Sequence, residues 1–301
     1  MDRIVEHYFD LRDLDNKEIS KLIENLNNTS TSGNYNIMSD HDKFNFIKRN
    51  NNKQLLVTLL ELTHNGKEFS DIINDEYKGI YDRVAKELYL NICTLHQYGV
   101  EVRAGMVNRL SGIDFNKFKD DFLLPLELLI VSFYSHRVND YVYTTRHQNI
   151  AGQVYLQAFM SETEKAQHLI KIVRFLNIAY REDKYALERI LRGKALSEQF
   201  NNKELVYQIY GIAFDAGINK SFILHQKAVF EMNHNVPNLN LALEHIDNID
   251  NEDSFYETKI VNHTKANLYR KLALVSRDIE EKKRLWSLGI KLLNKNLAGR
   301  N

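Results

Sequence analysis

Apolar residues recur at helical spacing along almost the whole chain, and polar residues fill the positions between them. The first clear example, at i, i+3, i+4 and i+7, is Ile19, Leu22, Ile23 and Leu26. Only two prolines, Pro125 and Pro237, and twelve glycines occur in 301 residues. Because both residue types mark turns, their scarcity argues against a chain of many hairpins. The sequence therefore predicts an all-α fold.

Short polar breaks divide the apolar pattern into separate predicted helices. After a first helix that starts near Asp15, these span residues 40–50, 52–64, 70–98, 102–111, 115–136, 141–160, 162–179, 183–199, 203–217, 219–233, 238–248, 252–273 and 277–296. Three starts match the capping-box pattern, in which a side chain accepts from the third residue of the helix: Asp15 with Glu18, Ser161 with Glu164, and Asp278 with Glu281. Pro125 is expected to kink a buried helix or to separate two.

Paired helices of about 15 residues that repeat every ~34–40 residues are typical of tetratricopeptide solenoids. Residues 205–214 with 221–230, and residues 256–272 with 278–293, have this organisation without the full consensus. We expect a right-handed superhelix of degenerate tetratricopeptide-like helical hairpins. An irregular helical bundle is the alternative.

A polar run from Asn27 to Asn36 contains nothing to bury and predicts a hinge. The predicted organisation is an N-terminal helical segment over 1–28, a linker over 29–38, and a helical-repeat domain over 39–301 that ends in dimerisation helices. Residues 1–28 are expected to move independently of the rest.

Composition narrows the class of protein. The chain is 44% hydrophobic and carries 40 basic and 40 acidic residues, whereas a typical nucleic-acid binder is basic. A single cysteine, Cys93, excludes an intramolecular disulfide and favours the cytoplasm. The charged N-terminus is unlike a secretory signal, and no apolar run reaches the ~18 residues of a membrane helix. We expect a soluble protein of the bacterial host cytoplasm.

Motifs for catalysis are missing. The eleven histidines include no His-Glu-x-x-His, and Gly99, Gly105 and Gly112 are too widely spaced for a phosphate loop. We therefore expect no enzyme activity, no metal and no cofactor. A Ser-His-Asp triad would meet only in the fold, so an all-α enzyme stays a third hypothesis.

Hydrogen-bonding side chains recur on one predicted helix face, at i, i+3, i+7 and i+11 from Arg146, and again from Arg174. Amide and guanidinium groups on the inner helices of a solenoid can hold a peptide backbone and its terminal carboxylate. With one tyrosine, the candidate peptide-binding residues are Arg146, Asn149, Gln153, Gln157, Arg174, Asn177 and Tyr207. The alternative is that they form the solvated faces of amphipathic helices.

The last predicted helix carries an apolar stripe that includes the only tryptophan of the chain. It consists of Trp286, Ile290, Leu293 and Leu297, and Leu285, Leu288 and Leu292 widen it. A terminal repeat needs a polar cap or a partner, so this stripe predicts the seam of a homodimer. Charge also reverses nearby, from six acidic residues and no Lys or Arg over 236–258 to eight basic and three acidic over 271–301. This reversal suits self-association or a charged protein partner.

The stretch from Leu239 to Asp250, with the helices at 256–272 and 282–293, resembles the C-terminal repeats of the arbitrium peptide receptors (AimR) of Bacillus phages. The order of helices over 55–228 is loosely similar. The resemblance implies a tetratricopeptide-like superhelix of the RRNPP group that binds a short peptide pheromone, dimerises, and controls gene expression such as the lysis-lysogeny decision.

One feature departs from that family, whose members usually open with a helix-turn-helix domain. Residues 1–50 show no convincing one, and residues 1–28 carry seven acidic against four basic side chains. The output therefore stays open between a protein partner and DNA. The competing hypotheses are a DNA-binding regulator with a divergent binding region and a protein-interaction scaffold without a peptide ligand.

Overall fold

A computed structural model describes residues 13–28, 37–49, 55–64, 67–112, 124–249 and 258–298. The chain divides into two compact units, Met1–Tyr81 and Asp82–Asn301. The described residues form fifteen helices and three short strands. The prediction of a mostly helical fold is confirmed, whereas the right-handed superhelix stays a prediction.

The first unit contains four helices: α1 (Asn16–Asn27), α2 (Asp40–Arg49), α3 (Leu55–Thr63) and α4 (Phe69–Lys78). The predicted capping box starts α1: the Asp15 carboxylate accepts from the backbone of Lys17 and Glu18, and Glu18 accepts from the Asp15 amide at 2.8 Å. Ile19, Ile23 and Leu26 of α1 share one core with Ile47 of α2. The helices on both sides of the predicted hinge are therefore packed together, while residues 29–36 lie outside the described residues.

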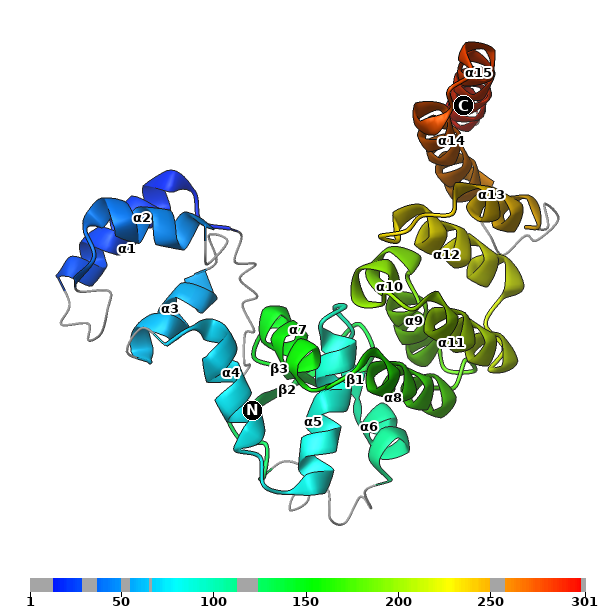
Figure 1. Ribbon diagram of the computed structural model, residues 1–301. Helices are drawn as coiled ribbons and strands as arrows, with labels where there is room; N and C mark the ends of the chain where they lie inside the picture. Colours follow the sequence, from blue (N-terminus) through cyan, green and yellow to red (C-terminus); the bar gives the residue numbers. More distant parts are fainter. Residues whose placement is uncertain are drawn as a thin grey trace. The chain divides into compact units, whose positions relative to one another are not determined.

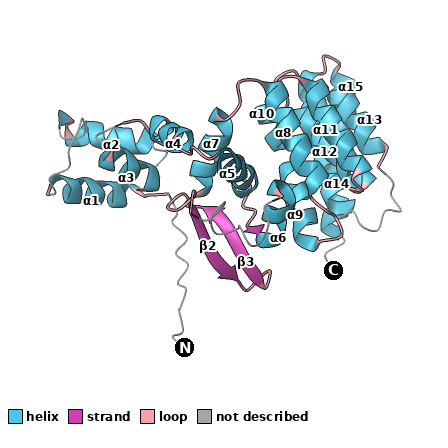
Figure 2. Ribbon diagram, turned by 90° about the horizontal axis from the view of Figure 1, so that it is seen from below, coloured by secondary structure: helices cyan, strands magenta, loops and turns pink. Residues whose placement is uncertain are grey.

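The second unit begins with α5 (Arg83–His96), β1 (Val102–Arg103), α6 (Ala104–Ser111), β2 (Ile130–Ser135), β3 (Asp140–Thr145) and α7 (Gln148–Gln157). The strands form one antiparallel sheet in the order β1-β3-β2, with Val102 opposite Tyr143 and Phe133 opposite Val142. Strands β2 and β3 lie side by side next to α5 and α7 (Figure 2).

The sheet corrects two predicted helices, 115–136 and 141–160, because residues 130–135 and 140–145 are strands. β-branched and aromatic residues dominate both segments and fit a pleated surface better than a helix. The turn between them contains Asn139 at φ 52, a left-handed conformation that asparagine tolerates. Pro125 lies in a turn before β2 and not within a helix, and residues 113–123 lie outside the described part.

The rest of the second unit is helical. Its helices are α8 (Glu162–Phe175), α9 (Arg181–Ile190), α10 (Gly193–Gln199), α11 (Lys203–Asp215), α12 (Lys220–Asn233), α13 (Leu239–Asp247), α14 (Thr258–Val275) and α15 (Ile279–Ala298). Consecutive helices pack on one another from α11 to α15, and α8 also packs on α11 and α10 on α12 (Figure 1). This order of contacts fits a helical-repeat arrangement. No described helix is long and apolar enough to cross a membrane.

Two long predicted helices are each split in the structure. The predicted helix 70–98 breaks between α4 and α5, where the Asp82 carboxylate accepts from the Ala85 amide at 2.7 Å and starts a new helix. The predicted helix 183–199 breaks between α9 and α10 at Leu191 and Arg192. Each break therefore divides one predicted helix into two separate helices.

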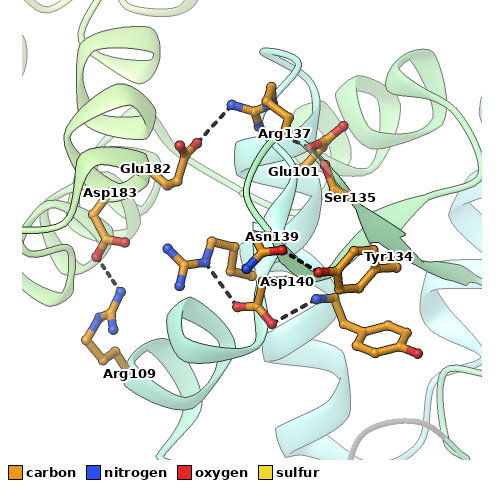
Figure 3. A network of polar contacts seen from close by, with 11 residues as sticks. Glu101, Arg109, Tyr134, Ser135, Arg137, Asn139, Asp140, Glu182 and Asp183 are labelled. Carbon is orange, nitrogen blue, oxygen red and sulfur yellow. Dashed lines mark hydrogen bonds and ion pairs between the residues drawn. The ribbon is translucent and has the colours of Figure 1, made fainter.

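Ion pairs fasten the β2–β3 hairpin to the helices (Figure 3). Arg137, in the turn of the hairpin, donates to Glu101 at 3.1 Å and to Glu182 of α9 at 2.9 Å. Arg109 of α6 donates to the buried Asp183 of α9 at 2.5 Å. Burial alone would lower the pKa of Arg137, but its hydrogen bonds to the two carboxylates outweigh that effect and raise the pKa. The start of α9 is thus held by two arginines from other elements.

Candidate functional site

Helices α9, α10, α12 and α14 enclose a cleft of about 570 Å³. Its floor depends on a close approach between α10 and α12 at Gly193. A Cβ at this position would lie 2.1 Å from the Gln226 carbonyl oxygen and 2.7 Å from the Phe230 amide nitrogen. The Gly193 amide also donates to Oε1 of Gln226 at 2.9 Å. Only glycine therefore allows this helix packing without a shift of the backbone.

Basic side chains dominate the lining of the cleft. It contains one acidic residue, Glu188, and four basic ones: Lys184, Arg189, Arg192 and Lys194. Lys184 and Glu188 are 3.9 Å apart and both are about half exposed, so this pair is weak and well screened. The cleft therefore presents a net positive field to a ligand.

An aromatic and amide surface lies beneath these charges, formed by Tyr185, Asn219, Phe222 and Gln226, with Val229 and Ile260. Nε and Nη2 of Arg189 both donate to the Tyr185 hydroxyl, at 2.9 and 2.6 Å. The guanidinium also lies 5.0 Å from the centre of the tyrosine ring. Arg189 is thus positioned before any ligand arrives, which lowers the entropy that binding costs.

His225 adds no charge to the cleft at neutral pH. Its side chain is buried and its Nε2 lies 2.7 Å from the Thr264 hydroxyl. Burial lowers the pKa of His225 to about 4. The positive field of the cleft therefore comes from lysine and arginine alone.

The first four predicted peptide-binding residues, which begin at Arg146, lie only partly on one helix. Asn149, Gln153 and Gln157 lie half-buried on α7, as predicted. Arg146 is exposed and precedes the helix, because His147 is the N-cap and its Nδ1 accepts from the Asn149 amide at 3.1 Å. The expectation that Arg146 shares the helix face is therefore wrong.

The second part of the stripe is also divided. Arg174 is exposed in the last turn of α8, but Asn177 lies beyond the end of that helix. The Asn177 side chain accepts from the Ala179 amide at 2.9 Å, and its backbone donates to Asp183 at 2.9 Å. These bonds form the turn that leads into α9, so the predicted common face with Arg174 is wrong.

Tyr207 lies in a network between helices. Its hydroxyl on α11 donates to Glu231 of α12 at 3.1 Å and lies 2.8 Å from Nε2 of His245 on α13. Glu231 is fully buried and pairs with Lys203. Burial and the charge of Glu231 raise the pKa of Tyr207, so the phenol stays protonated and joins three helices. None of the seven predicted peptide-binding residues lines the cleft.

The predicted dimer residues share one exposed face of α15: Trp286, Ile290, Leu293 and Leu297. Leu285 is buried on the side toward α14. Gly289 allows the two helices to approach, since a Cβ there would lie 3.3 Å from the Ala266 carbonyl oxygen. Beside this contact, Trp286, Ile290 and Leu293 line a groove of about 320 Å³. Within the described part of a single copy, the stripe is thus an exposed apolar surface.

Sequence reasoning did not find the cleft between α9 and α12. A signal was present, because four basic side chains occur between Lys184 and Lys194. The opposite wall comes from α12 and α14, however, and no local spacing connects those helices to α9. Among the described residues, no group of three His, Cys, Asp or Glu side chains could hold a metal ion.

Comparison with known proteins gives no relative for this chain. No family model matches it, and neither the curated proteins nor the solved structures contain a match. Functional inference therefore depends on the chemistry of the cleft and on the arrangement of the helices.

Proposed function

We propose that this chain is a helical-repeat regulator that binds a short peptide in the cleft between α9, α10, α12 and α14. The observation that carries the proposal is the set of four basic side chains around an aromatic and amide floor. The volume of about 570 Å³ lies within the ~300–1,000 Å³ of ordinary ligand pockets.

The lining suits a peptide carboxylate. A guanidinium can form two parallel hydrogen bonds with a carboxylate, and two arginines line the cleft: Arg189 in the last turn of α9 and Arg192 at the start of α10. The amide oxygens of Asn219 and Gln226 already accept from the backbone amides of Phe222 and Gly193, so these two side chains fix the shape of the cleft. Charge-assisted bonds contribute roughly 1.5–3 kcal/mol each and neutral ones about 1 kcal/mol. Most of the affinity would therefore come from the arginines.

The biological role follows from the resemblance to arbitrium receptors. The ligand would be a secreted communication peptide, and its binding would control gene expression such as the lysis-lysogeny decision. The stacked helical hairpins support this proposal, since such arrays commonly bind extended peptides. A homodimer through α15 is part of the proposal, and the output would act through a protein partner or through DNA.

A pair of matched charge reversals tests the site. Candidate peptides encoded beside the gene are titrated by calorimetry against the parent, Arg192→Glu and Arg174→Glu. Both arginines are exposed, but only Arg192 lines the cleft. We expect Arg192→Glu to weaken binding by about tenfold or more, because it replaces an attraction with a repulsion, while Arg174→Glu binds like the parent.

If Arg174→Glu weakens binding and Arg192→Glu does not, the ligand binds at the predicted residues around Arg174 and not in the cleft. If no peptide binds the parent, the peptide-receptor proposal is wrong, and a mobility-shift assay with DNA then separates the two remaining hypotheses. Unchanged melting temperatures of both variants serve as the control for folding.

A further inference from the structure

A second, smaller pocket of about 280 Å³ lies between α5, α6 and α8, away from the cleft proposed for the peptide. Its walls include Val84 and Leu88 of α5, Leu110 of α6, and Phe175 of α8. Val84 and Phe175 are 46% and 43% exposed, although both are large apolar side chains. The pocket thus has an apolar rim that is open to solvent.

Asn91 lines this pocket from the middle of α5 and is only 1% exposed. Among the residues that the structure describes, neither its Oδ1 nor its Nδ2 has a hydrogen-bond partner. A buried carboxamide without partners loses its bonds to water and gains none in return, so native proteins rarely keep one. A leucine would fill the same space without this cost. We therefore expect the folded protein to be less stable with Asn91 than with a leucine at this position.

Arg109 supplies a second unsatisfied group in the same pocket. Its Nη2 donates to Asp183 at 2.5 Å, and its guanidinium lies 4.7 Å from the centre of the Tyr180 ring. These contacts fix the side chain, and among the described residues its buried Nε and Oδ1 of Asp183 both lack a hydrogen-bond partner. Figure 3 shows Arg109 extended toward Asp183. Because a small shift within this ion pair lets Nε donate to Oδ1, Asn91 is the lining group whose need for a partner points to a ligand.

We infer that this pocket binds a small ligand that carries a carboxamide on an apolar body. Asn91 offers one donor and one acceptor, and only a ligand that both accepts and donates satisfies them together. The ligand oxygen would accept from Nδ2 of Asn91, and the ligand N–H would donate to Oδ1. A carboxylate would leave Oδ1 unpaired and facing a negative charge. The apolar body would lie against Phe175, Val84 and Leu88.

Both amide atoms of Asn91 are covered in the structure, so a ligand reaches them when a rim side chain shifts. Phe175 is a rim residue that can do so, because it is 43% exposed and is the last residue of α8. Such a shift would break the contact between the Phe175 ring and Lys171, whose Nζ lies 5.9 Å from the ring centre.

The test uses three probes of similar size: benzamide, benzoate and toluene. Thermal melting of the full chain is followed as each probe is added to millimolar concentration. We expect benzamide to raise the melting temperature of the parent in a concentration-dependent way, and benzoate and toluene to bind about tenfold or more weakly. Asn91→Leu should lose the benzamide response, and it should melt at or above the parent temperature without a probe.

Phe175→Ala is the second variant, because an exposed position can be truncated without unfolding the protein. It should bind benzamide several-fold more weakly than the parent, whereas Phe214→Ala, at an exposed position of α11 outside the pocket, should bind like the parent. Equal shifts with toluene, or no shift with benzamide, would overturn the proposal. So would Asn91→Leu melting well below the parent, because the amide would then be satisfied in the folded protein by internal water.

Discussion

Three histidines of the second unit are kept neutral by the fold: His225 is buried, and His96 and His168 are partly buried. Burial lowers the pKa of His96, with a smaller effect of the His147 charge, and burial alone does so for His168 and His225, in each case from 6.5 to about 4. His168 of α8 shows the arrangement: its Nε2 lies 2.9 Å from the Thr94 hydroxyl of α5, and its ring packs against Phe159. Each ring therefore joins two segments as an uncharged group.

This burial predicts a loss of stability in mild acid. In the unfolded chain the histidines take up protons near pH 6.5, whereas in the folded chain they do so only near pH 4. Unfolding therefore binds protons between these values, and the free energy of unfolding falls as pH drops from about 6.5 to about 4, by up to ~1.4 kcal/mol per pH unit for each histidine.

Urea denaturation at pH 7, 6 and 5 measures the effect. His168→Gln, which keeps a group that can pair with Thr94 but does not titrate, should show a shallower fall than the parent. An identical pH dependence in parent and variant would show that His168 is not the source of the effect.

At the scale of elements, local chemistry predicted most of the helices and missed the sheet. The starts of α1 and α8 follow from capping patterns, and the structure confirms the bonds from Asp15 and Ser161 to the backbone. The strands β2 and β3 were missed because Ile130–Ser135 and Asp140–Thr145 are only six residues each, and over so short a length the helical and strand patterns differ little. These segments are strands because β3 pairs with both β2 and β1, and that pairing is not visible in the local sequence.

The cleft could not be predicted for a related reason. Its four basic residues are close in sequence, but its depth depends on the contact between α10 and α12. The sequence also could not predict that the Asn91 amide lacks hydrogen-bond partners among the described residues. A polar residue among apolar ones in α5 can have partners on another helix, and those are known only from the fold. In contrast, the exposed stripe on α15 needed only helical spacing, and its residues do share one face.

The contact at Gly193 gives a prediction for the packing of α10 on α12. Gly193→Ala should destabilise the protein by about 1–3 kcal/mol or more, because the added carbon would lie 2.1 Å from the Gln226 carbonyl oxygen and force the helices apart. Gly211→Ala is the matched control: it lies within α11 with nothing within 4 Å of an added Cβ. That change should stabilise by about 0.5–1 kcal/mol through helix propensity.

Thermal or urea denaturation of the two variants measures their free energies of unfolding and so tests the close packing at Gly193. Equal stabilities of Gly193→Ala and Gly211→Ala would contradict the close packing that forms the floor of the cleft. Weaker peptide binding by Gly193→Ala, at a temperature where it remains folded, would connect this packing to the site.

At the scale of the whole molecule, the exposed stripe on α15 leads us to propose a homodimer. Trp286 is 46% exposed beside a groove on the α14–α15 pair, and the last helical pair of a repeat array otherwise needs a polar outer face. A second copy of the same stripe would cover these side chains through a two-fold interface.

Light scattering tests the dimer directly. The parent should have twice the mass of one chain, and the double variant Trp286→Glu with Ile290→Glu should have the mass of one chain with the far-UV circular dichroism spectrum of the parent, because both side chains are exposed in a single copy. Leu274→Glu, an exposed apolar position on α14, is the control and should leave the mass unchanged. A double variant with the parent mass would place the interface elsewhere.

The central claim is that the cleft holds a peptide through its carboxylate, and amidation of the peptide's C-terminus tests it most directly. Calorimetry compares the free and the amidated peptide on the parent and on Arg192→Glu. If the claim is correct, amidation weakens binding to the parent by about tenfold or more, which is about 1.4 kcal/mol, but does not weaken binding to Arg192→Glu, where it removes the repulsion between the carboxylate and the introduced glutamate. Equal affinities of the parent for both peptides, or the same loss on amidation in parent and variant, would contradict it.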